Sequence, residues 1–391
     1  MNSVQHVFIV GSKGIPGAYG GYETFVDKLT EYHQDNVQIK YHVACRSYDT
    51  EGEFEYHNAH CYKIKVANIG PASAILYDIA AIKYSIDYIQ KNNINHPIIY
   101  CLACRIGPVS AYFAKRIHKL GGKFYVNPDG HEWLRSKWCF LVRCYWKWSE
   151  RTMVKNADRL ICDSKNIEKY IQETYAKYKP ETTFIAYGAE IRRSNLADKD
   201  EKFTNWLAEK GLKPKEYYLV VGRFVPENNY ETMIREFMQS KTSKNFALIT
   251  NVNESFLDQL KKKTEFDKDP RIKFVGTVYD QELLMKIREQ AYGYFHGHEV
   301  GGTNPSLLEA LACTDLNLLL NVGFNKEVGE DAALYWNKEE GNLAKTIEYA
   351  DSMTDSEREH FAVASTERIK NAYSWEFIAN EYARVFGRSN T

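Results

Sequence analysis

The chain alternates short apolar runs with longer segments in which apolar residues recur at helical spacing. The runs at 4–10, 98–102 and 217–221 contain many β-branched and aromatic residues, as buried strands do. Further runs of this kind lie at 39–45, 61–66, 183–187, 246–250, 272–275 and 291–295. Strands that alternate with helices predict an α/β fold with mostly parallel sheets covered on both faces. A second series of such units begins near Lys215, so the pattern predicts two α/β domains.

The first expected strand leads directly into a glycine-rich loop. Five of the eleven residues from Gly11 to Gly21 are glycines, and the loop ends in the run GGYE ahead of an expected helix at 24–33. Such a loop lets a ligand approach the backbone closely. It does not match the dinucleotide fingerprint G-x-G-x-x-G, and no acidic residue follows the second strand in the usual register. Both observations argue against an NAD-dependent enzyme.

Another strand, glycine loop and helix occur where the sequence reads AYGYFHGHEVGGTNPSLLEALA. The loop carries Gly297, Gly301 and Gly302, and a helix is expected to begin near Pro305. Free backbone N–H groups and the helix dipole make such a helix start suited to a phosphate group. Glu309 would point back toward the same ligand, where its carboxylate can accept hydrogen bonds from sugar hydroxyls. The alternative is a packed turn with Glu309 as a surface charge.

Polar residues also follow other expected strands. In the first half, the run KFYVN precedes Asp129, His131 and Glu132, and the run RLIC precedes Asp163. The carboxyl ends of parallel strands are where open α/β sheets hold their ligands, so these groups are site candidates, although each could instead be structural. In the second half, Arg223 follows a strand beside a glycine. There it suits a diphosphate or, alternatively, a surface ion pair.

The segment from Leu134 to Trp148 mixes cations with large aromatic residues. Its cations are Arg135, Lys137, Arg143 and Lys147. This mixture fits a helix at a lipid headgroup interface or over a lipid-linked substrate. The alternative is that several of the aromatic residues belong to the core.

The composition is that of a globular protein with room for two to three domains. The 391 residues are 44% hydrophobic and 26% charged, and 51 basic side chains balance 51 acidic ones, so no global field draws the chain to nucleic acid. Of eight cysteines, only Cys101 and Cys104 have metal-like spacing, and we expect buried thiols in a reducing cytoplasm. Because neither a signal peptide nor a long apolar run is found, we expect a chain that neither leaves the cell nor spans a membrane.

In their order along the chain, these motifs resemble a known enzyme family. Two α/β halves, the GGYE loop, the GR after the second half's first strand, the PSLLEA helix and a terminal YSWE helix resemble retaining GT-B glycosyltransferases of family 4 over nearly the whole chain. The runs VNPDGHEW, VGRFVPENN and HGHEVGGTNPSLLEA resemble the bacterial β-1,4-rhamnosyltransferases of capsule and group-carbohydrate synthesis. The resemblance implies two Rossmann-like domains facing across a cleft. They would be an acceptor-binding domain at 1–188, joined by a C-terminal helix at 374–391 that crosses back to it, and a nucleotide-sugar donor-binding domain at 189–373.

The resemblance also implies roles for the candidate residues. The expected catalytic residues are Asp129, Glu132, Asp163 and Arg223. The expected donor-binding residues are Gly20, Gly21, Arg223, Asn228, His298, Gly301, Gly302, Thr303, Asn304, Ser306 and Glu309. The expected acceptor-binding residues are Tyr22, Glu23, Asp129, His131 and Trp133. Two positions depart from the wider family. Asn228 stands near where many members have a diphosphate-binding lysine, and Gly301 stands where an acid is common before Glu309.

The implied reaction moves L-rhamnose from dTDP-β-L-rhamnose to an undecaprenyl-diphosphate-linked glucose or N-acetylglucosamine, with no cofactor and no metal ion. Such an enzyme would be cytoplasmic and peripheral on the inner face of the cell membrane. Its partners would be the nucleotide-sugar, the lipid-linked acceptor and the membrane surface; a homodimer is left open, and nucleic acid is not expected. Two alternatives stay open: another glucosyl- or N-acetylglucosaminyltransferase on the same fold, or a non-catalytic sugar-nucleotide-binding subunit.

Overall fold

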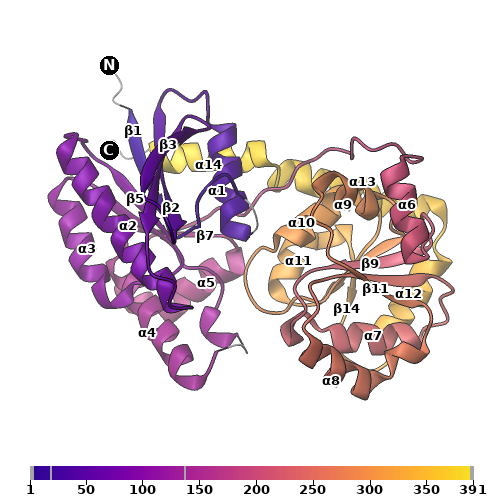
Figure 1. Ribbon diagram of the computed structural model, residues 1–391. Coiled ribbons are helices and arrows are strands. Elements are labelled where there is room, and N and C mark those ends of the chain that lie inside the picture. Colours follow the sequence, from indigo (N-terminus) through magenta and orange to yellow (C-terminus); the bar gives the residue numbers. More distant parts are fainter. Residues whose placement is uncertain (1–3, 18–19, 136–137, 388–391) are drawn as a thin grey trace. The chain divides into compact units, whose positions relative to one another are not determined.

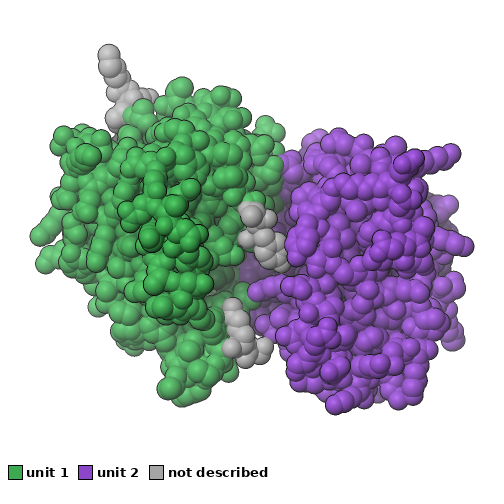
Figure 2. Space-filling model, in the orientation of Figure 1, with its two compact units in different colours: residues 1–188, 375–391 green, residues 189–374 purple. Residues whose placement is uncertain are grey.

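The computed structural model describes residues 4–17, 20–135 and 138–387. The chain divides into two compact units, which Figure 2 shows in different colours. Unit 1 comprises Met1–Gly188 and Trp375–Thr391, and unit 2 comprises Ala189–Ser374. The last helix of the chain therefore belongs to unit 1, although it follows unit 2 in the sequence.

Unit 1 is built on one sheet (Figure 1). Within its described residues the strand order is β3-β4-β2-β1-β5-β6-β7-β8, and neighbouring strands are parallel except for β3 and β4. The strands are β1 (Gln5–Val10), β2 (Ile39–Ser47), β3 (Gly52–Tyr56), β4 (Ala59–Lys65), β5 (Ile98–Leu102), β6 (Lys123–Asn127), β7 (Arg159–Cys162) and β8 (Thr182–Phe184). The helices are α1 (Gly21–Tyr32), α2 (Ala72–Lys91), α3 (Gly107–Lys119), α4 (Phe140–Asn156), α5 (Lys165–Thr174) and α14 (Trp375–Gly387).

The centre of this sheet is covered by helices on both faces. Phe8 of β1 belongs to a buried cluster that also contains Ile82 of α2 and Phe113 of α3. On the opposite face, the hydroxyl of Tyr100 in β5 lies 3.1 Å from that of Tyr382 in α14. Strands buried on both faces need no polar alternation, which explains the continuous apolar runs of β1 and β5.

Unit 2 repeats this architecture with a smaller sheet. Within its described residues the order is β11-β10-β9-β12-β13-β14, and all neighbours are parallel. The strands are β9 (Tyr217–Val221), β10 (Asn245–Ile249), β11 (Ile272–Gly276), β12 (Gly293–His296), β13 (Asn317–Leu320) and β14 (Leu334–Trp336). The helices are α6 (Glu201–Lys210), α7 (Tyr230–Gln239), α8 (Glu254–Thr264), α9 (Gln281–Glu289), α10 (Pro305–Cys313), α11 (Gly323–Gly329), α12 (Asn342–Ser352) and α13 (Asp355–Ala372).

One strand of unit 1 was not predicted. β3 pairs with β4 as an antiparallel hairpin at the sheet edge, and the turn between them holds His57 and Asn58 at φ values of 45° and 55°. Two consecutive residues with positive φ are typical of a tight hairpin turn, but such turns usually carry glycine. Since this turn has no glycine, the local sequence pattern did not predict the hairpin.

Two helices have boundaries that differ from the expected ones. The first helix begins at Gly21 rather than residue 24, which places Glu23 in the first turn, where the helix dipole favours an acid. The helix expected across 134–148 begins only at Phe140 and continues to Asn156. Ahead of it, Glu132–Leu134 form a short 3-10 helix, and Glu132 binds Arg135 and accepts a hydrogen bond from the Trp138 indole nitrogen at 2.9 Å.

Candidate functional site

The turn after β9 and the loop after β12 are neighbours in unit 2, because β9 and β12 are adjacent in its sheet. The side-chain nitrogen of Asn228 donates to the carbonyl oxygen of Arg223 at 2.8 Å. The side-chain oxygen of Asn228 lies 2.6 Å from the His298 Nδ1. Three of the predicted donor-binding residues are therefore brought together at the carboxyl edge of the sheet.

The backbone of the β12–α10 loop packs closely against the turn after β9. A Cβ atom at Gly297 would lie 2.4 Å from the carbonyl oxygen of Asn228, so a larger residue does not fit there. Gly301 has a φ of 132°, a conformation that side chains other than glycine rarely adopt. Both glycines of the sequence motif are thus required by the local backbone.

The start of α10 is fixed by the side chains of the motif itself. The Asn304 side-chain oxygen accepts a hydrogen bond from the Ser306 backbone N–H at 2.9 Å, as a helix N-cap does. The Ser306 hydroxyl donates to the Val221 carbonyl at 3.0 Å and lies 3.0 Å from the Tyr294 hydroxyl. These contacts attach the helix start to β9 and β12. Gly302 and Thr303 are buried beside it, and ligand contacts by this group stay a prediction.

Glu309 is held by a residue that the sequence did not single out. Its carboxylate lies 2.7 Å from Nη2 of Arg288, whose side chain is only 5% exposed, whereas that of Glu309 is 41% exposed. The same guanidinium donates to the Ser306 hydroxyl at 3.3 Å. A buried arginine thus orients an acid that still reaches solvent. Arg288 lies in α9, so only the folded arrangement brings it to α10.

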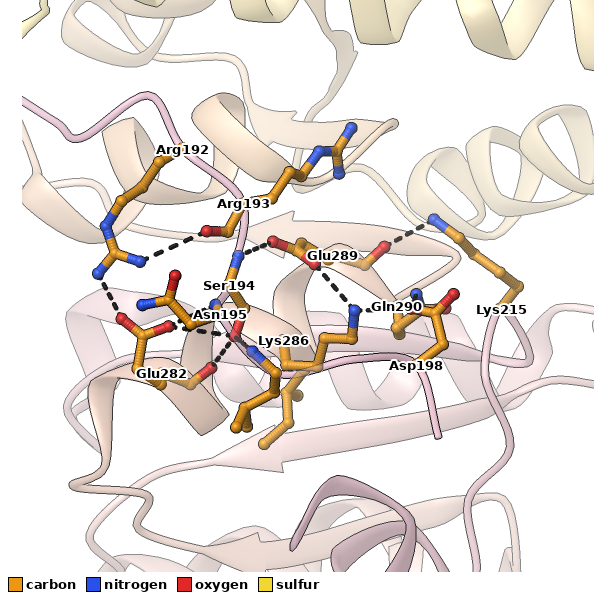
Figure 3. A network of polar contacts seen from close by, with 12 residues as sticks. Arg192, Arg193, Ser194, Asn195, Asp198, Lys215, Glu282, Lys286, Glu289 and Gln290 are labelled. Carbon is orange, nitrogen blue, oxygen red and sulfur yellow. Dashed lines mark hydrogen bonds and ion pairs between the residues drawn. The ribbon is translucent and has the colours of Figure 1, made fainter. Parts of the chain in front are cut away.

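Figure 3 shows how α9 is itself anchored. The backbone N–H of Ser194 donates to Glu289, and Lys286 pairs with Glu289 at 3.4 Å and with Asp198 at 2.6 Å. The network ties the first segment of unit 2 to the helix that carries Arg288. These contacts therefore help to hold Arg288 in place, because they anchor the helix that carries it.

In unit 1, a second group of polar residues gathers after β5, β6 and β7 and at the start of α1. Burial raises the pKa of the Tyr22 phenol well above its ordinary value, and the charge of Asp129 adds to this effect. Tyr187 and Asp163 also raise the pKa of Tyr22, whereas Arg105 lowers it. The predicted residues Tyr22, Asp129 and Asp163 therefore share one electrostatic environment. Arg105 and Tyr187 are members that the sequence did not indicate.

Arg105 links this cluster to the interior of the sheet. Its Nη1 donates to the carbonyl oxygen of Gly11 at 2.9 Å and pairs with Asp78 at 3.1 Å. Asp78 is fully buried, and burial raises its pKa to about 6 despite the opposing charge of Arg105. A titratable carboxyl therefore lies directly behind the cluster.

Asp129 has an unusual backbone. Its φ is 59°, in the left-handed region, which aspartate adopts more often than most residues other than glycine. Its N–H donates to the side-chain oxygen of Asn127 at 2.8 Å, and its own carboxylate accepts from the Gly130 N–H at the same distance. Backbone strain of this kind is common at functional sites, where surrounding contacts over-determine one conformation.

The other predicted residues of this segment have local partners. The His131 ring packs on Tyr170 with centroids 4.2 Å apart, and burial lowers the pKa of His131. Lys147 lies over the ring of Trp133 at 4.4 Å and pairs with Glu150. His131 therefore packs against α5 and Trp133 against α4, and the predicted roles of His131, Trp133 and Glu132 toward an acceptor stay predictions.

These contacts correct the expected use of the cations in this segment. Arg135 is buried against Glu132, and the Nε of Arg143 donates to the Trp133 carbonyl at 2.8 Å. Arg135 and Arg143 were expected to face lipid headgroups, but both are engaged within the protein, because the carboxylate and carbonyl groups around them need donors. Lys137 lies outside the described residues.

The predicted glycine-rich loop of unit 1 is hydrogen-bonded to Glu23 in the first turn of α1. The Glu23 carboxylate accepts a hydrogen bond from the Lys13 backbone N–H at 2.7 Å. Gly20 has a φ of 135°, a conformation that residues with a side chain rarely adopt, so glycine is needed there. Gly20 and Gly21 lie in unit 1, whereas the other predicted donor-binding residues lie in unit 2. Their assignment to the donor stays a prediction.

The described residues lack two other kinds of feature. They contain no group of three or more His, Cys, Asp or Glu side chains placed to hold a metal ion. Among the helices in the described part of the chain, none is long and apolar enough to cross a membrane.

Comparisons with known proteins place this geometry in context. A family model described as Domain of unknown function (DUF1972) matches residues 4–190. Among curated protein sequences, none matches this chain. Solved structures do match over almost the full length. Sucrose-phosphate synthase from Thermosynechococcus elongatus is 18% identical with a TM-score of 0.76, covering 98% of both chains.

Two further structures contain nucleotide ligands. The E. coli structure described as trehalose-6-phosphate bound with UDP-2-fluoro glucose is 12% identical with a TM-score of 0.74, covering 98% of this chain and 99% of the other. Anabaena HepE in complex with UDP is 13% identical with a TM-score of 0.69, covering 98% of this chain and all of the other. At these identities the likeness establishes the fold, which is the GT-B fold with one mostly parallel sheet in each of two units.

Proposed function

We propose that this chain is a retaining glycosyltransferase that moves L-rhamnose from dTDP-β-L-rhamnose to a glucose or N-acetylglucosamine linked to a lipid diphosphate. The GT-B fold supports glycosyl transfer as the reaction class. Rhamnose and the lipid-linked acceptor are supported by the sequence resemblance of VNPDGHEW, VGRFVPENN and HGHEVGGTNPSLLEA. No cofactor or metal ion is part of the proposal.

The observation that carries the proposal is the arrangement around α10 in unit 2. Arg223 is exposed, and no ion pair with a described residue occupies its guanidinium group. The start of α10 lies after the neighbouring strand, and Glu309 is oriented by Arg288. A cation and a helix N-terminus suit a diphosphate, and an oriented carboxylate suits the 3′-hydroxyl of a thymidine nucleotide. Nucleotides occur in similar folds, since HepE was solved with UDP.

During transfer, negative charge develops on the leaving thymidine diphosphate. Arg223 and the positive end of the α10 helix dipole would stabilise that charge. In unit 1, Asp129 is the first candidate for contacting the acceptor hydroxyl, with Asp163 in the same electrostatic environment. Glu132 is a weaker candidate than Asp129, because Arg135 and Trp138 already bind its carboxylate. Retention of the anomeric configuration follows from the family resemblance.

The proposed acceptor requires contact with a membrane surface, and unit 1 offers an apolar surface for it. Phe140 and Leu141 at the start of α4 are 76% and 77% exposed, and Leu134 and Trp148 nearby are also exposed. Because Arg135 and Arg143 are engaged within the protein, we propose that insertion of these apolar side chains, rather than headgroup attraction alone, brings the enzyme to the inner face of the cell membrane. A homodimer is left open.

A donor panel tests the proposal against its alternatives. The protein is incubated with dTDP-β-L-rhamnose, UDP-glucose or UDP-N-acetylglucosamine and a short-chain prenyl-diphosphate-linked N-acetylglucosamine or glucose. Transfer from the rhamnose donor alone supports the proposal. Transfer only from a UDP-sugar would show another hexosyltransferase, and donor binding without transfer from any of the three would indicate a sugar-nucleotide-binding subunit.

A further inference from the structure

Unit 1 contains a cavity of about 660 Å³, and the predicted acceptor-binding residue Glu23 lies in its lining. It lies after β1 and at the carboxyl end of β2, and residues of β3 and β4 complete its lining. Its lining residues are Lys13, Gly14, Ile15, Pro16, Glu23, Cys45, Arg46, Ser47, Gly52, Glu53, Phe54 and Lys63. This volume lies within the range of roughly 300–1,000 Å³ typical of small-molecule sites, so the cavity has room for more than a lone phosphate.

The wall of the cavity is held in place by backbone contacts. The Arg46 N–H donates to the Lys13 carbonyl at 2.9 Å, which joins the loop after β1 to the end of β2. Gly14 has a φ of 108°, and a Cβ there would lie 2.6 Å from the Cys45 sulfur, so the loop approaches β2 more closely than another residue would allow. The cavity is therefore formed before any ligand arrives.

The acidic and basic side chains of the lining differ in whether they have partners within the protein. Both carboxylates already have protein donors, since Glu23 accepts from the Lys13 N–H, and Glu53 binds Tyr84 and lies 3.1 Å from His60. The three cations of the lining are Lys13, Arg46 and Lys63. No ion pair joins any of them to a described residue.

Two of these cations rest on aromatic rings instead. Arg46 lies 5.3 Å from the ring of Tyr48, and Lys63 lies 5.8 Å from the ring of Phe54. Such contacts orient a cation and leave its charge uncompensated. The cavity therefore presents three cations that form no direct ion pair with a described residue, a set that suits the oxygens of a phosphate ester.

We propose that this cavity binds the diphosphate group of the lipid-linked acceptor. The inference rests on the proposed function, because that function supplies an acceptor with a diphosphate. Glu23 would face the acceptor from the α1 side of the cavity, while Tyr22 belongs to the neighbouring cluster with Asp129. The start of α1 thus lies between a basic cavity for the diphosphate and an acidic cluster for the reacting sugar.

Direct binding without donor tests the inference separately from turnover. Titration calorimetry measures a short-chain prenyl-diphosphate-linked N-acetylglucosamine against the wild type and the variant Lys13→Gln/Arg46→Gln/Lys63→Gln. We expect the triple variant to lose about tenfold or more in affinity, since charge-assisted hydrogen bonds are worth about that much each. Lys65→Gln is the matched control, because Lys65 is in the same strand as Lys63, is exposed and does not line the cavity. It should bind as the wild type does.

Two further ligands identify what the cavity recognises. N-acetylglucosamine 1-phosphate should bind more weakly than the prenyl diphosphate, and an uncharged octyl glycoside of the same sugar should bind the wild type and the triple variant equally. Equal affinity of both proteins for the prenyl diphosphate would overturn the inference, as would preferred binding of the sugar phosphate. An equal loss for the octyl glycoside would also overturn it, since damage to the fold would then explain the result. Each of these outcomes is independent of the donor panel.

Discussion

Glu309 and Arg223 are the residues on which the proposed donor site depends. We expect Glu309→Ala and Arg223→Ala each to weaken binding of thymidine diphosphate by about ten- to a hundredfold, because a charge-assisted hydrogen bond contributes about 1.5–3 kcal/mol. Titration calorimetry measures the effect, with the exposed Glu340→Ala of unit 2 as the control.

Since Arg288 orients Glu309, Arg288→Leu should cause little further loss of nucleotide affinity once Glu309 is alanine. Unchanged affinity in both single variants would remove these residues from a nucleotide site.

Asp78 gives the fold a specific pH dependence. Burial raises its pKa from 3.8 to about 6, so folding favours the protonated carboxyl. The stabilising contribution of Asp78 is therefore complete below about pH 4 and is lost as the pH rises through 6. A shift of this size corresponds to about 3 kcal/mol. Compared with Asp78→Asn, which keeps an acceptor for Arg105, the wild type should lose thermal stability between pH 4 and pH 7. Parallel Tm profiles of the two proteins would contradict this assignment.

Among the secondary structure elements, α4 shows what the sequence pattern could and could not predict. Its mixture of cations and aromatic residues was visible, but the start of the helix at Phe140, which leaves Arg135 outside it and paired with Glu132, was not. The same is true of Arg288 and Glu309, which meet only because α9 packs beside α10. Local patterns predicted the order of strands, loops and helices, whereas contacts between elements could be identified only from the folded structure.

The start of α4 leads to a prediction about membrane binding. Replacing Phe140 and Leu141 with serine should reduce binding to vesicles of phosphatidylcholine and phosphatidylglycerol by about tenfold or more, since each fully buried apolar side chain contributes roughly 1.5–3 kcal/mol. Co-sedimentation measures this, with Val363→Ser as the control, because Val363 is an exposed apolar residue in unit 2. Vesicle binding that is unaffected by the double substitution would show that α4 does not insert into the bilayer.

At the scale of the whole molecule, the order of motifs predicted the fold class correctly. Parallel strands that alternate with helices allow few arrangements, and GGYE, GR and PSLLEA follow strands at the carboxyl edges of the two sheets. Substrate choice does not follow from this architecture, because one fold serves many donors and acceptors. The cavity lined by Lys13, Arg46 and Lys63 could not be predicted from the sequence, because these three cations come from three separate segments and meet only in the folded chain.

The most direct test of the account is the product formed from dTDP-β-L-rhamnose and a prenyl-diphosphate-linked N-acetylglucosamine or glucose. The wild type should attach one rhamnose, and nuclear magnetic resonance of the purified product should show a β-linkage to position 4 of the acceptor sugar. Asp129→Asn should form the same product much more slowly at saturating acceptor, because an interaction needed mainly in the transition state affects kcat. An α-linked product, or no product from either acceptor with intact protein, would contradict the account.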